Sequence, residues 1–135
     1  MKTIVFACVH NAGRSQMAAA FVNQLANGKA RAVSAGTNPG TRVHPEVVEA
    51  MQEVGVDLSA AVPQKLTTEL AAGANMLITM GCGDLCPVVP GARRDDWPLE
   101  DPKGKQIAQV RAIRDDIRRR VETLLIDEGW SAKPR

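Results

Sequence analysis

Residues 3–15 read Thr3-Ile4-Val5-Phe6-Ala7-Cys8-Val9-His10-Asn11-Ala12-Gly13-Arg14-Ser15. The first six are a short apolar run rich in β-forming residues, which predicts a buried strand. A polar loop that contains Gly13 comes next, and from Arg14 to residue 26 hydrophobic side chains recur at four-residue spacing, as on one face of a helix. A strand, a tight loop and a helix in direct succession predict the first unit of an α/β domain with a parallel sheet.

The rest of the chain continues this alternation. Short segments at residues 31–35 and 92–97 and a buried apolar run at 75–80 predict three more strands. Helices are expected at 44–54, from 67 or 68 to 72 and from 107 onward, where the apolar face consists of Ile107, Val110, Ile113, Ile117, Val121 and Leu124. Because crossovers between parallel strands are right-handed, the simplest arrangement is a single α/β domain over residues 1–135, with a four-stranded parallel sheet in the order 2-1-3-4 and helices on both faces. A ligand then binds outside the carboxyl ends of the first and third strands.

Composition excludes several classes of protein. The chain has 135 residues, 44% hydrophobic and 24% charged, with a net charge of +2, which is ordinary for one globular domain. Basic residues are dispersed and only 3% of residues are aromatic, so a nucleic-acid partner is not expected. No apolar run approaches the roughly 18 residues of a membrane helix, and the N-terminal run is too short for a secretory signal. We therefore expect a cytoplasmic protein that needs no membrane, and a monomer.

The chain has three cysteines, Cys8, Cys82 and Cys86. An odd number argues against a secreted disulfide framework, whereas thiols in a reducing cytosol are more often catalytic, redox-active or metal-binding. The predicted topology brings all three to one edge of the sheet. A metal site would have to recruit His10 or His44 from separate loops, so neither a metal nor a cofactor is expected.

The loop between the first strand and helix has the residues of an anion cradle. Such a loop points its backbone N–H groups inward, and the helix N-terminus adds positive potential. Gly13 permits close backbone approach, Asn11 tolerates a left-handed conformation, and the Arg14 guanidinium can grip two oxygens at once. Cys8 would lie at the floor of the cradle as a thiolate, with a hydrogen bond from the Ser15 hydroxyl. The oxyanion-binding set is Val9, His10, Asn11, Ala12, Gly13 and Arg14.

These residues make the sequence similar to a known family. Cys8 to Ser15, at a junction of strand, loop and helix, resembles the low-molecular-weight protein tyrosine phosphatases, whose fold is flavodoxin-like. Further segments resemble the arsenate reductase branch of that superfamily; they are Arg14-Ser15-Gln16-Met17-Ala18, Val33-Ser34-Ala35-Gly36-Thr37, the cysteine pair before Pro87, Asp96-Trp97, Asp101-Pro102 and Val110-Arg111-x-x-Arg114-Asp115-x-Ile117.

The resemblance implies a role for each of these groups. Cys8 would attack arsenate, for which phosphate or sulfate are mimics, within a loop that includes Asn11, Arg14 and Ser15. Asp101 would be the general acid that protonates the leaving oxygen. Cys82 and Cys86 would resolve the Cys8 adduct through a Cys8–Cys82 and then a Cys82–Cys86 disulfide, which thioredoxin would reduce.

The sequence departs from the family pattern in three places. The resolving cysteines are separated by three residues, fewer than in some members. Some members bind potassium through a glutamate where this chain has Ala19, so the resemblance carries no potassium site here, although Asn11 and Ser34 match. Gly13 stands where some members have another cysteine, which the expected relay does not need.

The sequence is also compatible with three other functions. A small thiol, such as mycothiol or glutathione with a glutaredoxin, would resolve the Cys8 adduct directly and make Cys82 and Cys86 dispensable. A protein tyrosine phosphatase needs only Cys8, Arg14 and Asp101, yet the loop at residues 99–104 has no aromatic wall for a phosphotyrosine ring. A regulatory arsenic or redox sensor is the third, and no segment resembles a DNA-reading helix-turn-helix.

Overall fold

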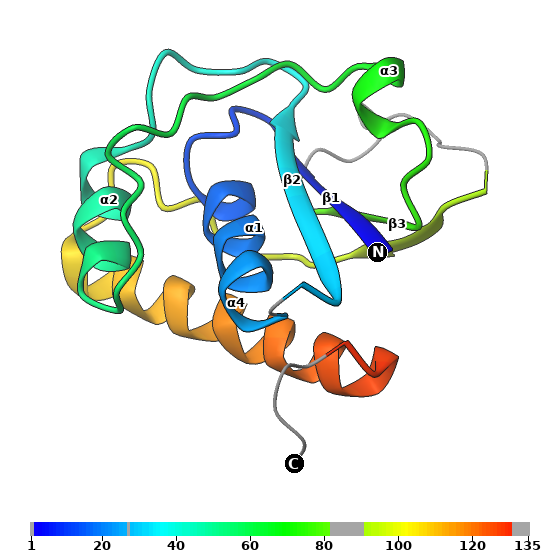
Figure 1. The fold of residues 1–135 in the computed structure, drawn as a ribbon. Coiled ribbons are helices and arrows are strands. Elements are labelled where there is room, and N and C mark those ends of the chain that lie inside the picture. The colour runs from blue at the N-terminus through cyan, green and yellow to red at the C-terminus, as the bar shows by residue number, and fades with distance from the viewer. Residues whose placement is uncertain (1, 27, 82–90, 131–135) are drawn as a thin grey trace.

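The structure is a computed structural model, and it describes residues 2–26, 28–81 and 91–130. The strands and helices follow one another in the predicted order, with two helices, α2 and α3, between the second and third strands (Figure 1). The strands are β1 (Lys2–Cys8), β2 (Ala30–Gly36), β3 (Met76–Thr79) and β4 (Arg93–Asp96), and the helices are α1 (Arg14–Leu25), α2 (Pro45–Gln52), α3 (Thr68–Ala71) and α4 (Ile107–Glu128).

The four strands form one parallel sheet in the order β2-β1-β3-β4, which confirms the predicted topology. β1 lies in the middle and pairs with β2 so that Cys8 is opposite Gly36. On its other side, β1 pairs with β3 from Ile4 to Ala7. Cys8 therefore ends a central strand, at the edge of the sheet where ligands of such folds bind.

Helices cover both faces of the sheet, but unequally (Figure 1). The larger hydrophobic cluster contains Ile4, Phe6 and Cys8 of β1 together with buried residues of α1, α2 and α4. The smaller cluster contains Val5 and Ala7, which point to the opposite face and pack with residues of α3 and its flanking loops. β1 is thus buried on both faces, which explains why its sequence is a continuous apolar run.

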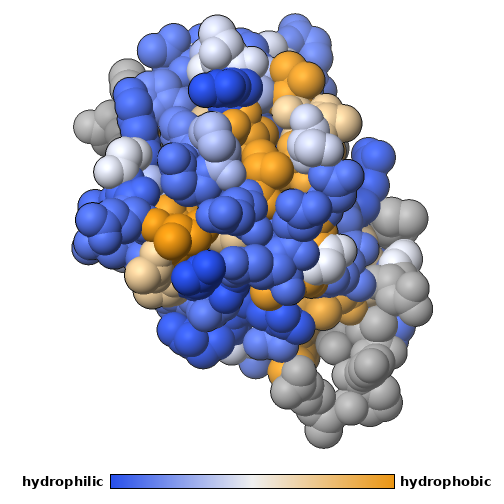
Figure 2. Space-filling view, turned by 90° about the vertical axis from the view of Figure 1, so that its left-hand side faces the viewer, coloured by the Kyte–Doolittle hydropathy of each residue, from blue (hydrophilic) through white to orange (hydrophobic). Residues whose placement is uncertain are grey.

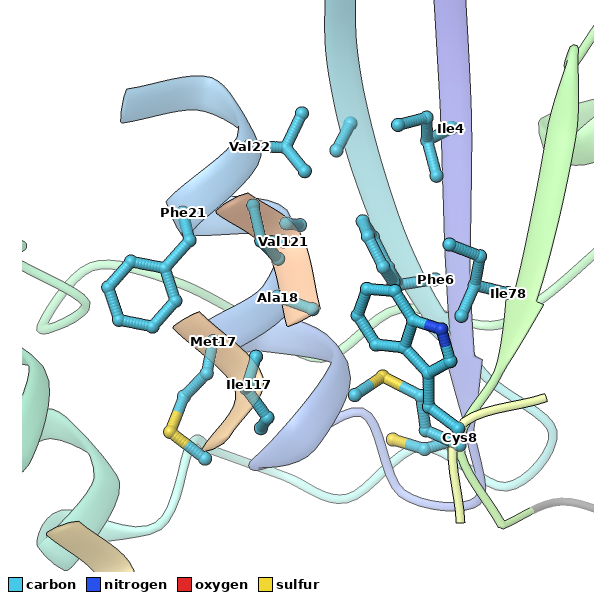
Figure 3. Packing of buried hydrophobic residues seen from close by; sticks show 14 of the residues in the cluster. Ile4, Phe6, Cys8, Met17, Ala18, Phe21, Val22, Ile78, Ile117 and Val121 are labelled. Atoms are coloured by element: carbon cyan, nitrogen blue, oxygen red, sulfur yellow. The ribbon is translucent and has the colours of Figure 1, made fainter. Parts of the chain in front are cut away.

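The larger cluster fixes α1 and α4 against the sheet. Figure 3 shows Met17, Ala18, Phe21 and Val22 of α1 among Ile117 and Val121 of α4 and the side chains of β1. Phe6 packs against Trp97, with ring centroids 5.5 Å apart and planes tilted by 52°. This contact joins the centre of β1 to the residue that follows β4 and leads into the loop at residues 98–105.

The boundaries of α4 follow from its terminal residues. Gln106 and Gln109 form a reciprocal capping box at its start, and Gly129 ends it in the left-handed region with φ of 75°. The spacing of its hydrophobic residues is amphipathic as predicted, although Leu125 is more deeply buried than Leu124.

The surface over α2 and the start of α4 is largely hydrophilic, with narrow hydrophobic strips between polar side chains (Figure 2).

None of the helices in the described parts of the chain is both long and apolar enough to cross a membrane.

Replacing Ile117 with alanine should lower the free energy of unfolding by about 2–5 kcal/mol, because the side chain is fully buried and its loss leaves a cavity between α4 and α1. Urea denaturation followed by circular dichroism would measure the change. Ile126→Ala is the matched control, since Ile126 lies on the same helix but is 45% exposed. Equal losses in the two variants would contradict this packing.

Glu53, which follows α2, ties that helix to α4. Arg111 Nη2 donates to Glu53 Oε2 at 2.7 Å, and Arg114 Nη1 donates to Glu53 Oε1 at 2.8 Å. Arg114 also donates to the Ala50 carbonyl at 2.9 Å, so this arginine turns toward α2 instead of lying on a solvated face. The hydrogen bonds from Arg111 and Arg114 lower the pKa of Glu53 from 4.5 to about 2.

This lowered pKa predicts how a Glu53→Gln variant depends on pH. Because the folded pKa lies below the ordinary value, the carboxylate stabilises the fold fully above about pH 4.5 and loses that effect as the pH falls toward 2. The variant should therefore be less stable than wild type near pH 7, and the gap should close in acid. Urea titrations between pH 2 and 7 would measure this, with Glu46→Gln on the exposed face of α2 as the control. A gap that is constant with pH would refute the assignment.

Candidate active site

The loop from Val9 to Gly13 connects β1 to α1 and is held by backbone hydrogen bonds from the segment that follows β2. Asn38 N–H donates to the Val9 carbonyl at 2.8 Å and His44 N–H donates to the Ala12 carbonyl at 3.0 Å. Asn11 adopts the left-handed conformation, with φ of 52°, as the sequence predicts. Val9 and His10 are half-buried, and the other predicted oxyanion-binding residues are buried.

Gly36 allows this loop to lie close to β2. A Cβ atom at Gly36 would lie 2.5 Å from the Val9 carbonyl oxygen and 3.0 Å from the Asn11 nitrogen. Both neighbours are backbone atoms, which cannot give way as a flexible side chain can. The glycine that ends β2 is therefore required by the close approach of two backbone segments.

Cys8 lies at the inner end of the loop and is 2% exposed. Its Sγ atom is 2.9 Å from Ser15 Oγ, and the Asn11 N–H donates to the same sulfur at 3.3 Å. Asn11 Nδ2 in turn donates to Ser15 Oγ at 2.7 Å. The Asn11 N–H thus donates to the sulfur, and the Ser15 hydroxyl lies within hydrogen-bond distance of it, an arrangement that can stabilise a thiolate.

Arg14 is the first residue of α1, and its guanidinium faces the loop that follows β4. Nη1 donates to the Leu99 carbonyl at 3.0 Å, and Nη2 lies 3.7 Å from Asp101 Oδ2. The Arg14 side chain is 9% exposed and that of Asp101 is 43% exposed. The structure therefore brings Asp101, a candidate that is more than eighty residues away in sequence, to the arginine of the oxyanion loop.

The loop that carries Asp101 also touches the oxyanion loop directly. A Cβ atom at Gly13 would lie 2.6 Å from Pro102 Cγ and 3.6 Å from His44 Cδ2. Gly13 is thus the residue that lets Pro102 pack on the start of α1. His44 lies at the N-terminal end of α2 as predicted, and burial lowers its pKa although the charges of Asp101 and Glu46 act in the opposite direction.

Gly81 approaches Arg14 from the end of β3. Its φ is +95°, and a Cβ atom there would lie 2.6 Å from Arg14 Nη1. The residue that precedes Cys82 is therefore beside the oxyanion loop. Cys82 and Cys86 themselves lie outside the described residues.

Two residues with direct contacts to the loop were not identified from the sequence. Gln16 Nε2 lies 3.1 Å from both the backbone oxygen and Oδ1 of Asn11. The backbone N–H of Gln64 donates to Asn11 Oδ1 at 3.0 Å. Gln64 lies in a stretch without helical or strand periodicity, so no sequence pattern could have indicated its role.

The arrangement suits nucleophilic attack on a tetrahedral oxyanion. A buried sulfur that contacts the Asn11 N–H and the Ser15 hydroxyl supplies the nucleophile, the loop and Arg14 can hold oxygens, and a carboxyl group lies near the arginine. Within the described ranges, no group of three or more His, Cys, Asp and Glu side chains could hold a metal ion. The chemistry that Cys8, the oxyanion loop and Arg14 support is thiol-based, because the Cys8 sulfur is the buried nucleophile.

Comparison with known proteins places the chain in a family. Residues 3–132 match the family described as low molecular weight phosphotyrosine protein phosphatase, and the chain belongs to that family. Among its relatives is the glutaredoxin arsenate reductase of Synechocystis, 36% identical over 128 residues, which are 93% of this chain and 97% of the relative. The arsenate reductase of Staphylococcus aureus is 33% identical over 125 residues, covering 90% of this chain and 94% of the relative.

Solved structures give the same result. The thioredoxin-dependent arsenate reductase of Corynebacterium glutamicum superposes with a TM-score of 0.79 and 39% identity over 92% of this chain, which spans 60% of that protein's length. An arsenate reductase in the phosphate-binding state superposes with a TM-score of 0.83 and 34% identity, covering 94% of this chain and 98% of the other. The flavodoxin-like fold expected from the sequence is confirmed.

Proposed function

We propose that the protein is an arsenate reductase in which Cys8 attacks arsenate and a thiol relay through Cys82 and Cys86 releases arsenite. The observation that carries the proposal is the environment of Cys8. Its sulfur is buried at the start of an anion loop, with Ser15 Oγ at 2.9 Å and the Asn11 N–H at 3.3 Å. The names of the relatives support arsenate, a tetrahedral oxyanion, as the substrate.

The proposed reaction begins with an adduct. The Cys8 thiolate forms a bond to arsenic while one arsenate oxygen leaves as water, with a proton from Asp101. Arg14 and the loop N–H groups hold the remaining oxygens. Arsenic is still pentavalent at this point, and the sulfur is covalently bound to it.

The relay then supplies two electrons. The Cys82 thiolate attacks Cys8 Sγ, the sulfur–arsenic bond breaks with its electron pair on arsenic, and arsenite leaves. Cys86 next attacks Cys82, which frees the Cys8 thiolate and leaves a Cys82–Cys86 disulfide. The close approach of Gly81 to Arg14 supports this route, because the residue that precedes Cys82 lies beside the arginine that follows the oxyanion loop. In this proposal thioredoxin reduces the final disulfide, in a reducing compartment such as the cytoplasm.

A single-turnover experiment tests the reaction without any reductant. Fully reduced protein mixed with arsenate should form one arsenite per chain, and its titratable thiols should fall from three to one. Phosphate should compete as a mimic. Absence of arsenite, together with rapid hydrolysis of an aryl phosphate, would instead favour the phosphatase activity in the family's name.

A second way of resolving the Cys8 adduct also has support, because one relative is named a glutaredoxin arsenate reductase. In that route a small thiol such as glutathione or mycothiol attacks the Cys8 adduct, and a glutaredoxin-type protein recycles the mixed disulfide. Serine at both Cys82 and Cys86 would then spare turnover with the small thiol. In the relay that we propose, the same double variant loses turnover.

Gly13→Ala tests whether the contact with Pro102 positions Asp101. The new methyl group would meet Pro102 and push the loop away from α1, and displacement of a reacting group by about 1 Å can lower a rate about a hundredfold. We expect kcat for arsenate to fall by roughly 10- to 100-fold, measured by arsenite formation at saturating substrate. Gly28→Ala, which has no neighbour within 4 Å of its Cβ position, is the control for a general loss of stability. An unchanged kcat in Gly13→Ala would mean that the packing of Pro102 on Gly13 is not needed to position Asp101.

A further inference from the structure

Two glutamine side chains contact the oxyanion loop and the strand beside it. Gln16, on α1, is 8% exposed, and its Nε2 atom lies 3.1 Å from both the backbone oxygen and Oδ1 of Asn11. Gln64 approaches from the segment before α3, and its Nε2 atom donates to the Ser34 carbonyl at 2.9 Å. The backbone N–H of Gln64 donates to Asn11 Oδ1 at 3.0 Å.

These contacts decide which way the Asn11 amide points. The two ends of a carboxamide have similar shapes, so only its hydrogen-bond partners distinguish them. A backbone N–H can only donate, so Gln64 requires an oxygen opposite it, and the Gln16 amide supplies a second donor to the same oxygen. Asn11 Nδ2 must then face Ser15 Oγ, to which it donates at 2.7 Å.

The orientation of Asn11 in turn sets the direction of the Ser15 hydroxyl. Because Ser15 Oγ accepts from Asn11, its own hydrogen is left for Cys8 Sγ, 2.9 Å away. We propose that Gln16 and Gln64 are positioning residues that lock the Asn11 amide, so that the Ser15 hydroxyl donates to the Cys8 thiolate. This inference rests on the proposed role of Cys8 as the nucleophile.

The same contacts make a potassium ion unnecessary. The oxygens of Asn11 and Ser34 are the kind of ligand that a hard cation prefers, but here amide N–H groups bond to them. Ala19, where some family members carry a glutamate, is 7% exposed and offers no ligand. The residues present therefore do not fit a cation, and neutral amides support the loop in its place.

Gln16→Met tests the proposal because methionine keeps the length of the side chain and removes its donors. The rate of Cys8 alkylation by iodoacetamide at pH 7, followed by mass spectrometry of the Cys8 peptide, should fall roughly threefold to tenfold, the loss of one hydrogen bond. We expect kcat for arsenate to fall by a similar factor while KM changes less than about twofold, because the backbone path of the loop keeps its own hydrogen bonds. Gln24→Met, at an exposed position of the same helix, should change neither rate.

Two further variants separate this role from packing. Gln16→Glu places a carboxylate oxygen against the backbone oxygen and Oδ1 of Asn11, all of which are acceptors. This variant should slow alkylation of Cys8 more than Gln16→Met does. Gln64→Ala loses the bond to Ser34 but keeps its backbone N–H, so it should slow alkylation less. Wild-type turnover should be the same in potassium and in sodium chloride at equal ionic strength.

The proposal would be overturned if Cys8 in the Gln16→Met variant were alkylated at the wild-type rate. It would also be overturned if turnover by the wild-type protein were faster in potassium chloride than in sodium chloride. Alkylation requires no arsenate, so its outcome stays distinct from failure of the proposed reductase activity.

Discussion

Replacing Cys8 with serine should reduce arsenite formation to the uncatalysed background, a loss of at least about 10⁴-fold in kcat. The hydroxyl of serine is a far weaker nucleophile than a thiolate at neutral pH, and the donors that meet at this position are arranged around sulfur. Serine also cannot form the disulfide that expels arsenite. The variant therefore fails at both the adduct step and the release step.

The Cys8→Ser variant should still fold and bind the anion. Cys8 is 2% exposed at the edge of the larger hydrophobic cluster, and serine is of similar size. The anion loop is built from backbone N–H groups and Arg14, which the substitution does not touch. Calorimetric titration with phosphate should give near-wild-type affinity, and arsenite production by a variant that binds normally would exclude Cys8 as the nucleophile.

Arg14→Lys should lower kcat/KM for arsenate by roughly 10²- to 10³-fold, the effect of losing a preorganised donor at a reacting oxyanion. The guanidinium presents a planar fork, whereas lysine is a point charge on a flexible stem. In the structure this fork reaches two groups at once, the Leu99 carbonyl at 3.0 Å and Asp101 at 3.7 Å. Lysine would lose one of these contacts, and the carboxyl group would no longer be held beside the bound oxyanion.

Steady-state kinetics would separate the two losses in Arg14→Lys. A higher KM reports weaker oxyanion binding, and a lower kcat reports misplacement of Asp101 or weaker stabilisation of the transition state. Arg119→Lys is the matched control, because Arg119 lies on α4 with a side chain that is 69% exposed. Wild-type kcat/KM in Arg14→Lys would show that a charge alone is sufficient at this position.

Much of the fold could be predicted because it depends on local patterns. The continuous apolar run of β1 indicates burial on both faces, and the structure packs Phe6 and Val5 into different clusters. Pro45 marks the start of α2, and Thr67 caps α3 by accepting from Leu70 N–H at 3.0 Å. These features depend on residues that are close together in the sequence, so they can be recognised without knowledge of the tertiary structure.

The contacts that complete the site depend on the tertiary fold. Gln64 reaches Asn11 across 53 residues of chain, and Pro102 packs on Gly13 from a loop whose sequence indicates only a turn. Arg114 lies on the charged side of a helical pattern yet turns toward Ala50 and Glu53. In each case the partner is set by how helices and loops meet over the sheet.

The central claim is that electrons pass from Cys82 and Cys86 to the arsenic on Cys8, and that thioredoxin restores them. It is tested most directly by arsenate-dependent oxidation of NADPH with thioredoxin and thioredoxin reductase, using wild type and Cys86→Ser. We predict steady turnover by wild type and, in the variant, at most one arsenite per chain before turnover stops. Sustained turnover by Cys86→Ser, or activity that requires a small thiol and its redoxin in place of thioredoxin, would contradict the three-cysteine relay.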